Sequence, residues 1–318
     1  MQKRLEGTLV DHNRRSGRRF APSVNGRVAA FAARQFARVV IAACAVLLAA
    51  CSMPRIAYNN ADTVLRYKAW RYFDLDSAQS EALQAKFSRL QNWHRANELP
   101  LYTALLQDAG RRVAHGVKSG DVAWAISSLR ARYRRLVVKA AEEAAAVLVT
   151  LGPAQLAVLE HKVAEDNADY AKEFLASNEK TRQRAQLKRV LDRFRDFIGG
   201  LTPEQEARIE RFVKANERHA VLRFEDRQRW QRDAITLIRR QREPQVLAQR
   251  LVELFNQPEL RRTEEFLRED RRWEEDLTQL IVDLNRTLSP AQRARAVERL
   301  DGYAGDATAL IIRMGEAA

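Results

Sequence analysis

The chain has 318 residues, with 55 basic and 41 acidic side chains, a formal net charge of +14 and two cysteines. This length allows a substantial core or two domains, and two cysteines exclude a disulfide-rich fold. Residues 1–50 contain nine of the basic and two of the acidic residues, so 46 basic and 39 acidic residues remain in the rest of the chain. Without the first 50 residues the net charge is therefore +7.

A short apolar segment ends this first part of the chain. Residues 39–50 read VVIAACAVLLAA without a charge, and three arginines lie shortly before them. These apolar residues are fewer than the about 20 that a membrane-spanning helix needs. A basic region followed by a short apolar core and small residues is typical of a cleaved export signal. We therefore predict that residues 1–50 are a cleaved signal region, in which residues 1–26 form an over-long start.

The end of this segment, Leu48-Ala49-Ala50-Cys51, resembles the lipobox of bacterial lipoproteins. The resemblance implies that Cys51 is the first residue of the mature protein and carries a covalent diacylglycerol and an N-acyl chain such as palmitate. Ser52 stands where an aspartate would signal inner-membrane retention in enterobacterial-type sorting, which points to the outer membrane, facing the periplasm. The alternative is that Cys51 is an incidental residue at the end of a signal peptide. Because Cys44 lies within the signal, the mature chain has no cysteine pair for a disulfide or a thiolate metal site.

The remaining residues show helical periodicity and no convincing strand-type alternation. Apolar or small residues recur at steps of three and four, which places them on one face of a helix. We predict an all-α fold, an elongated multi-helix bundle with one or more long helices and no β-sheet. Residues 51–75 are expected to form a lipid-anchored N-terminal segment with a short aromatic helix, and residues 76–318 the bundle. The two clearest series are Val122, Ile126, Leu129, Tyr133, Leu136, Ala140, Ala144 and Val147, and Leu260, Leu267, Leu277, Ile281, Leu284 and Leu288.

One sequence element recurs at four predicted helix starts. It reads LDSAQ, LGPAQ, LTPEQ and LSPAQ, at irregular intervals of 76, 50 and 87 residues, which excludes a solenoid of fixed period. The second residue of each element can cap the helix, a proline fits the first helical position, and the glutamine can complete a capping box. We interpret the element as a reused helix opening. The expected cap and glutamine pairs are Asp76 with Gln79, Gly152 with Gln155, Thr202 with Gln205, and Ser289 with Gln292.

Glycines and prolines indicate further helix boundaries. Pro100 opens a helix toward Gly116, Gly199 ends another, and Pro244 and Pro258 bracket a short one. The apolar stripe between residues 153 and 198 fades across ASNEKTRQ and then resumes. Either one continuous helix or a break near Ser177 fits this pattern, and we favour the continuous helix.

The segment after the lipobox carries a family resemblance. Residues 55–62 read RIAYNNAD and residues 72–75 read YFDL, and with the preceding lipobox they resemble the domain of unknown function 6279 family of proteobacterial lipoproteins. This resemblance implies an all-helical lipoprotein with no assigned activity, catalytic residue or cofactor. The LTPEQ-type elements are also similar to the Leu-Thr-x-x-Gln elements of small periplasmic stress chaperones, although helix capping explains them locally.

The same segment contains a candidate interaction patch of polar and aromatic side chains ahead of and within a short helix. Asn60 could cap this helix while its aromatic side chains, which include Tyr67, dock into the bundle. The alternative is that the side chains form a recognition surface near the lipid anchor. The candidate residues are Tyr58, Asn59, Asn60, Asp62, Trp70, Tyr72 and Phe73.

The histidines and sequence motifs of the chain favour a protein that is not an enzyme. His94 with Glu98 and His161 with Glu165 have helical metal-ligand spacing, but two such pairs would have to meet in space. The chain contains no HExxH, Gly-x-Ser-x-Gly, Walker or Gly-x-Gly-x-x-Gly motif. We therefore expect no catalytic residues, no metal and no cofactor beyond the acyl groups on Cys51.

Arginine clusters such as Arg261-Arg262 and Arg271-Arg272 could contact phosphates, but acidic residues alternate with them, as on a solvated helix face. Export excludes cytoplasmic nucleic acid as a partner, so the expected partners are the membrane, an unidentified envelope protein or anionic lipid. We predict a non-enzymatic envelope lipoprotein that acts as a structural or protein-interaction module, and the alternative is a periplasmic holdase-type chaperone. A concave apolar surface rimmed by arginine would favour the chaperone, and one local patch on a well-packed bundle would favour the module.

Overall fold

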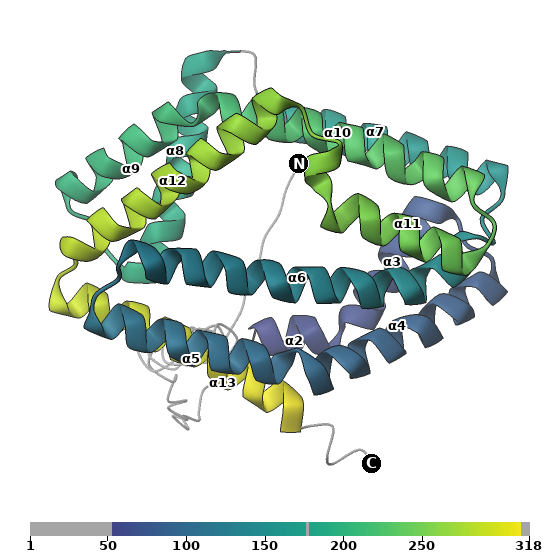
Figure 1. Cartoon of the computed structure of the whole chain (residues 1–318), viewed down its shortest axis with the longest axis horizontal. Helices are drawn as coiled ribbons and strands as arrows, with labels where there is room; N and C mark the ends of the chain where they lie inside the picture. The colour runs from purple at the N-terminus through teal and green to yellow at the C-terminus, as the bar shows by residue number, and fades with distance from the viewer. Residues whose placement is uncertain (1–52, 176–177, 313–318) are drawn as a thin grey trace, which may run out of the picture. The chain divides into compact units, whose positions relative to one another are not determined.

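The computed structural model describes residues 53–175 and 178–312, which lie in one compact unit, Ser52–Ala318 (Figure 1). The described residues form twelve α-helices and one 3-10 helix, with no strand, which confirms the all-α prediction. None of these helices combines the length and apolar character that a membrane crossing requires. The first six helices are α2 (Met53–Asn59), α3 (Ala61–Phe73), α4 (Ser77–Asn97), α5 (Leu99–His115), α6 (Ser119–Leu148) and α7 (Pro153–Phe174). The others are α8 (Glu179–Ile198), α9 (Pro203–Ala215), α10 (Glu217–Arg240), α11 (Pro244–Asn256), η1 (Pro258–Leu260), α12 (Glu264–Arg286) and α13 (Pro290–Ile312).

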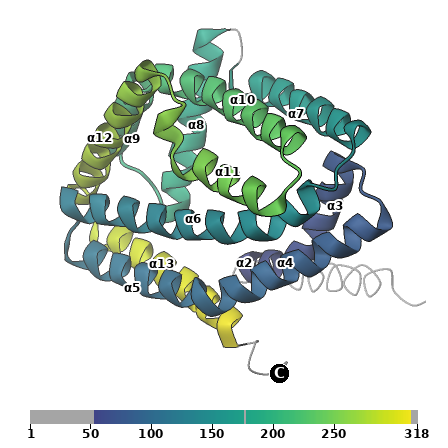
Figure 2. The same cartoon turned by 45° about the vertical axis from the view of Figure 1, so that its right-hand side comes forward.

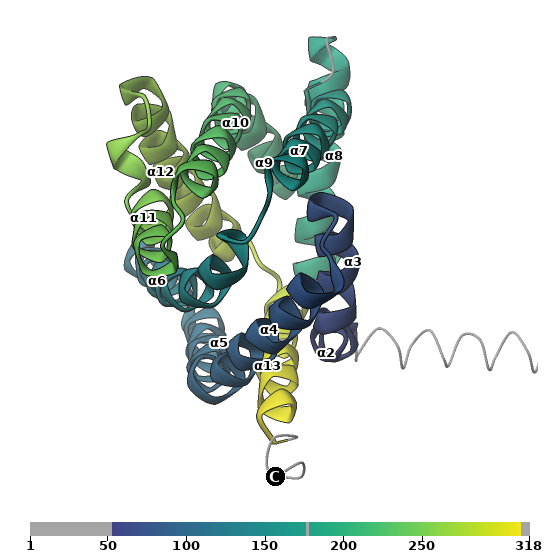
Figure 3. The same ribbon diagram turned by 90° about the vertical axis from the view of Figure 1, so that its right-hand side faces the viewer.

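The longest helix, α6, packs against α11 on one side and against α4 and α5 on another (Figures 1 and 2). Helix α13 lies along α5, and α3 packs on α4 and α7 (Figure 3). The largest cluster of buried side chains lies between α6, α7, α10 and α11, and a second cluster joins α9 to α12. Burial of these apolar faces is the main favourable term that holds the helices together.

The four predicted helix openings are confirmed as caps. In the first, the Asp76 carboxylate accepts from the Gln79 amide at 2.8 Å, and the Gln79 side chain accepts from the Asp76 amide at 3.2 Å. The same reciprocal bonds join Thr202 to Gln205 and Ser289 to Gln292. In the second copy, whose capping residue is the glycine at position 152, the backbone N–H of that residue donates to the Gln155 side chain at 2.9 Å. Each opening therefore satisfies backbone groups that a helix end leaves free.

The openings also bind one another in two pairs, which the sequence analysis did not predict. Gln155 donates to Gln79 at 2.6 Å, and Gln292 donates to Gln205 at 2.9 Å. Each glutamine also donates to a backbone carbonyl five residues before its partner glutamine. The pairs join the start of α4 to that of α7 and the start of α9 to that of α13. The four accepting carbonyls belong to Thr150, Asp74, Thr287 and Gly200.

The prediction of one continuous helix from 153 to 198 is wrong, because the structure has two helices in this range. Helix α7 ends at Phe174, and α8 begins at Glu179 with its own cap, in which the Asn178 side chain accepts from the Thr181 amide at 3.0 Å. The two helices pack on different neighbours, α7 on α3 and α10, and α8 on α9 and α13. Because α7 and α8 bury their apolar faces against different helices, the segment that joins them does not continue the apolar stripe.

The predicted apolar series are only partly buried. Leu260 is 72% exposed because it lies in η1, ahead of α12, and not on the helix that carries the rest of its series. On α6, Val122 and Val147 are buried, whereas Leu129 and Tyr133 are about half exposed, at 51% and 50%. Tyr133, Ala140 and Ala144 line a cavity. The apolar periodicity therefore predicts helix α6 correctly, but it does not show whether the apolar face of the helix packs against protein or lines a cavity.

Candidate functional site

The first part of the predicted interaction patch fixes α2 to the bundle. The Tyr58 hydroxyl lies 2.9 Å from His94 Nδ1, and the Gln91 amide donates to the Tyr58 carbonyl at 2.8 Å. Arg95 donates to the Asn59 side chain at 2.9 Å and also lies over the Tyr58 ring. Burial raises the pKa of Tyr58 and lowers the pKa of His94. Tyr58 and Asn59 therefore join α2 to α4 and are not free to bind a partner.

The next two patch residues make only local contacts. Asn60 occupies the cap position of α3 but makes no capping bond, because its side chain donates backward to the Ile56 carbonyl at 2.8 Å. Asn60 therefore stands at the expected N-cap position of α3, but its side chain does not cap the helix. Asp62 lies 3.8 Å from Arg66 in an exposed pair, which contributes little to stability.

The aromatic residues of α3 divide between two faces. Tyr72 and Phe73 are half-buried, and the Tyr72 hydroxyl donates to the Asp166 carboxylate, which raises the pKa of Tyr72. Tyr67 and Trp70, in contrast, are 55% and 65% exposed. The prediction that the aromatic side chains dock into the bundle thus holds for Tyr72 and Phe73 and is wrong for Tyr67 and Trp70.

The exposed face of α3 forms what we call the aromatic stripe, Val64, Tyr67 and Trp70. These residues recur at steps of three, so they share one side of the helix. The Tyr67 and Trp70 ring centroids are 6.4 Å apart, and Val64 is 55% exposed. The neighbouring basic residues Arg66, Lys68 and Arg71 are also exposed. The aromatic stripe and these basic residues thus place apolar surface beside positive charge. They lie on a helix whose opposite face packs against the bundle.

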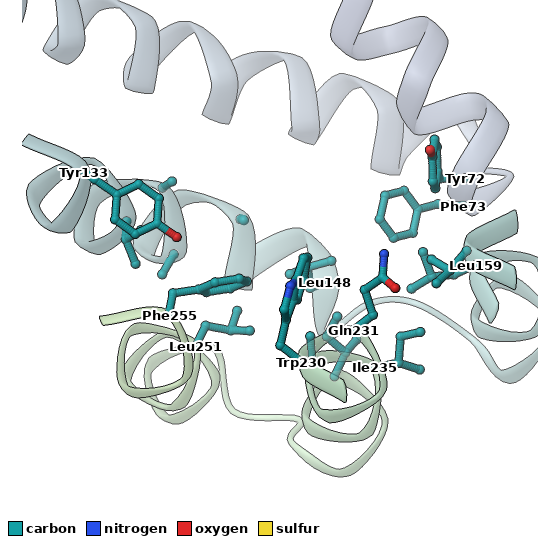
Figure 4. A pocket seen from close by; sticks show the side chains of 17 residues that line it. Tyr72, Phe73, Tyr133, Leu148, Leu159, Trp230, Gln231, Ile235, Leu251 and Phe255 are labelled. Atoms are coloured by element: carbon teal, nitrogen blue, oxygen red, sulfur yellow. The ribbon is translucent and has the colours of Figure 1, made fainter. Parts of the chain in front are cut away.

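Tyr72 and Phe73 point into a cavity of 450 Å³, which we call the apolar cavity (Figure 4). Its wall comes from five helices, α3, α6, α7, α10 and α11. The lining residues are Tyr72, Phe73, Tyr133, Val137, Ala140, Ala141, Ala144, Leu148, Leu159, Val163, Trp230, Gln231, Ala234, Ile235, Ile238, Leu251 and Phe255. Gln231 is the only residue among them with a polar side-chain amide, and the volume falls within the usual range of ligand sites, about 300–1,000 Å³.

Small side chains on facing helices create this space. Helix α6 presents Ala140, Ala141 and Ala144 to the cavity, and α10 presents Ala234. A leucine at such a position would fill volume that an alanine leaves open, whereas protein interiors are otherwise closely packed. The alanines therefore leave the space between α6 and α10 unfilled at this level while keeping its wall apolar.

A second, polar pocket of 760 Å³ shares part of this wall, and we call it the arginine pocket. Four residues line both spaces, namely Tyr133, Trp230, Gln231 and Phe255. The charged residues of the arginine pocket are Arg223, Asp226, Arg227, Arg229, Asp233, Arg261, Arg262 and Asp270. Five arginines against three aspartates give the pocket a positive balance next to an apolar space.

Ion pairs fix some of these arginines but not all of them. Arg262 lies 3.1 Å from Asp226 and 3.4 Å from Asp270, and Arg261 lies 3.3 Å from Asp233. A hydrogen bond from buried His219, at 3.0 Å, lowers the pKa of Asp270. In the described part of the chain, no carboxylate lies within ion-pair distance of the other three arginines of the pocket.

The two His and Glu pairs with helical metal-ligand spacing lie outside both pockets. His161 lies 3.1 Å from Glu165 on the exposed side of α7, and His94 contacts Tyr58 and Tyr102. Among residues 53–175 and 178–312, no group of three or more His, Cys, Asp or Glu side chains is placed to hold a metal ion. Cys51 and the predicted signal region lie outside the described residues.

Sequence reasoning missed both pockets. Periodicity places Ala140 and Ala144 on the apolar face of a helix, where small residues in the middle of the stripe can also indicate open space. The sequence around Arg261 and Arg262 indicates a solvated helix face, whereas their partners Asp226, Asp233 and Asp270 come largely from other parts of the chain. No pattern in the sequence places Trp230 or Gln231 beside α3.

The described residues define an all-α helical-bundle protein with an apolar cavity and an exposed aromatic stripe. The model of the Family of unknown function (DUF6279) matches residues 71–268, and the chain belongs to this family. Neither the curated proteins nor the solved structures gave a match to the chain. Family membership is thereby confirmed, although the segment 55–62 lies ahead of the matched residues, and the likeness to the Leu-Thr-x-x-Gln chaperones received no support.

Proposed function

We propose that this protein is a non-enzymatic lipoprotein of the bacterial envelope that acts as an interaction module through the aromatic stripe on α3. Lipidated Cys51 holds it to the outer membrane on the periplasmic side. Cys51 is two residues ahead of α2 in the sequence, so the covalent chain keeps α2 and α3 near the anchor. The partner is a second envelope protein with an apolar surface and acidic residues that match the stripe.

The exposure of Trp70 and Tyr67 on a fixed helix is the observation that carries this proposal. Their other face is held by Ala69, which is buried, and by Tyr72, which binds Asp166 on α7. Tryptophan and tyrosine are enriched among the residues that dominate binding energy, and a helix held in place loses little freedom on binding. The flanking Arg66, Lys68 and Arg71 supply charge that selects an acidic partner.

A holdase-type chaperone is the second candidate function, because a concave apolar surface beside arginines is present. The apolar cavity and the arginine pocket have this character. Their volumes, 450 and 760 Å³, fit a single small ligand and not an extended unfolded segment. This size favours the interaction module.

The test compares Trp70→Ala and Tyr67→Ala with Leu260→Ala in the full chain. Leu260 is 72% exposed on η1 and serves as the control for loss of exposed apolar surface. After crosslinking in intact envelopes, we expect one discrete protein partner, whose recovery falls about tenfold or more with Trp70→Ala. Melting temperature should hardly change in any of the three variants, because these side chains are exposed.

Two outcomes would contradict the proposal. One is crosslinking of the stripe to lipid alone, which would make it a membrane-contact surface. The other is suppression of aggregation of unrelated unfolded proteins by the wild type and by every variant, with no discrete partner, which would identify a holdase.

A further inference from the structure

We propose that the apolar cavity and the arginine pocket together form a binding site for a single-chain amphiphile with an anionic head group. The acyl chain lies in the apolar cavity, and the carboxylate or phosphate lies among the arginines. This inference does not depend on the aromatic stripe or on its partner.

The apolar cavity has the chemistry of an acyl-chain site. Its wall consists of aliphatic and aromatic side chains together with the small side chains of Ala140, Ala144 and Ala234. Figure 4 shows Phe73, Trp230 and Leu148 facing the same open space. A flexible hydrocarbon gains the full hydrophobic stabilisation there and meets almost no polar group that it would leave unpaired.

The arginine pocket has the chemistry of an anion site. Arg261 and Arg262 are bound to aspartates, but Arg223, Arg227 and Arg229 on α10 have no carboxylate within ion-pair distance in the described part of the chain. Guanidinium groups form paired hydrogen bonds with carboxylate and phosphate, and these charge-assisted bonds are stronger than neutral ones. The excess of arginine over aspartate favours an anion over a cation.

The position of Gln231 connects the two halves of the site. Gln231 lines both spaces, and its Oε1 accepts from Asn167 Nδ2 at 2.8 Å. This bond orients the amide, and Figure 4 shows its nitrogen on the side of Phe73. No described residue accepts a bond from that nitrogen, so it can donate to an oxygen atom of a bound ligand. One molecule with an apolar tail and an anionic head thus matches the whole surface.

The test uses photoreactive probes on membranes that hold the full chain. The probes are a diazirine-labelled palmitic acid, its methyl ester, and a diazirine-labelled lysophosphatidic acid, and mass spectrometry maps the labelled residues. We expect the anionic probes to label lining residues of α6, α10 and α11 about tenfold more than the ester does. Preference for the fatty acid or for the lysophospholipid identifies the source of the head group, and either supports the proposal.

Two sets of variants test the tail and the head separately. Ala144→Leu should reduce labelling by all three probes, whereas Ala123→Leu, on the exposed side of the same helix, should not. The double variant Arg227→Gln with Arg229→Gln should lower labelling by the anionic probes to the level of the ester, and exposed Arg232→Gln on the same helix should leave it unchanged. Melting temperatures confirm that each variant is folded. Equal labelling by acid and ester in the wild type, or labelling of the cavity that survives both sets of variants, would overturn the proposal.

Discussion

At the residue scale, the buried glutamine of the LTPEQ element contributes to both a cap and a tertiary contact. Gln205 has no exposed surface, accepts from the Thr202 amide at 3.0 Å and donates to the Thr287 carbonyl at 3.1 Å. Its counterpart in the other pair, Gln79, is only half-buried. Water can therefore replace the lost bonds of Gln79 but not those of Gln205.

We predict that Gln205→Ala lowers the free energy of unfolding by about 1–3 kcal/mol, because it leaves buried backbone groups unpaired. Gln79→Ala should cost less, and Gln249→Ala, an exposed position on α11, should cost almost nothing. Chemical denaturation of the three variants gives the comparison. Equal losses for Gln205→Ala and Gln79→Ala would show that burial of the pair is unimportant.

The pair of His219 and Asp270 predicts how stability depends on pH. Hydrogen bonding to His219 lowers the pKa of Asp270 below its ordinary value of 3.8 in the folded state. The stabilisation is therefore present above this value and is lost as the pH falls through the folded pKa. We expect Asp270→Asn to be less stable than the wild type at about pH 5, with a difference that shrinks toward about pH 3. Asp196→Asn, at an exposed position, is the control, and a pH-independent difference for Asp270→Asn would contradict this account.

At the element scale, the two glycines after α8 have different roles. Gly199 has φ of +90°, and an added Cβ would lie 3.4 Å from the Arg295 side chain. Gly200 has no atom within 4 Å of such a Cβ and does not have positive φ. Only Gly199 therefore needs the conformational freedom of glycine to end the helix.

We predict that Gly199→Ala lowers the free energy of unfolding by about 1–3 kcal/mol, because its φ of +90° and ψ of −156° lie in a backbone region that is essentially restricted to glycine. Gly200→Ala should leave the free energy of unfolding unchanged or raise it by up to about 1 kcal/mol, because alanine restricts the unfolded chain without straining the folded one. Thermal denaturation distinguishes the two. Equal destabilisation by both substitutions would place the strain elsewhere in the turn.

At the scale of the whole molecule, the prediction from Leu48-Ala49-Ala50-Cys51 is that two acyl chains on the glycerol and one on the amine hold the protein to the membrane. Several chains bind far more firmly than the marginal attachment of one. Cys51→Ala should abolish palmitate incorporation and release the protein from the membrane fraction, while Cys44→Ala should leave both unchanged. Retention of Cys51→Ala in the membrane would disprove the anchor.

The sequence by itself determined the helical class, the family and most helix starts, because those depend on local features. Caps such as Thr202 with Gln205, and prolines such as Pro244, act within one turn of helix and so can be identified without knowledge of the fold. The expectation for Cys51 also comes from a local pattern and remains a prediction.

Only the tertiary structure decided which side chains share a surface. The glutamine pairs, the break between α7 and α8, and the exposure of Trp70 beside docked Tyr72 depend on how distant helices pack. The apolar cavity depends most on how the distant helices pack. The same sequence pattern allows an alanine such as Ala144 to face either a close neighbour or open space. Helical periodicity specifies that a face is apolar, and the arrangement of the facing helices specifies whether that face is filled by protein or left open to a ligand.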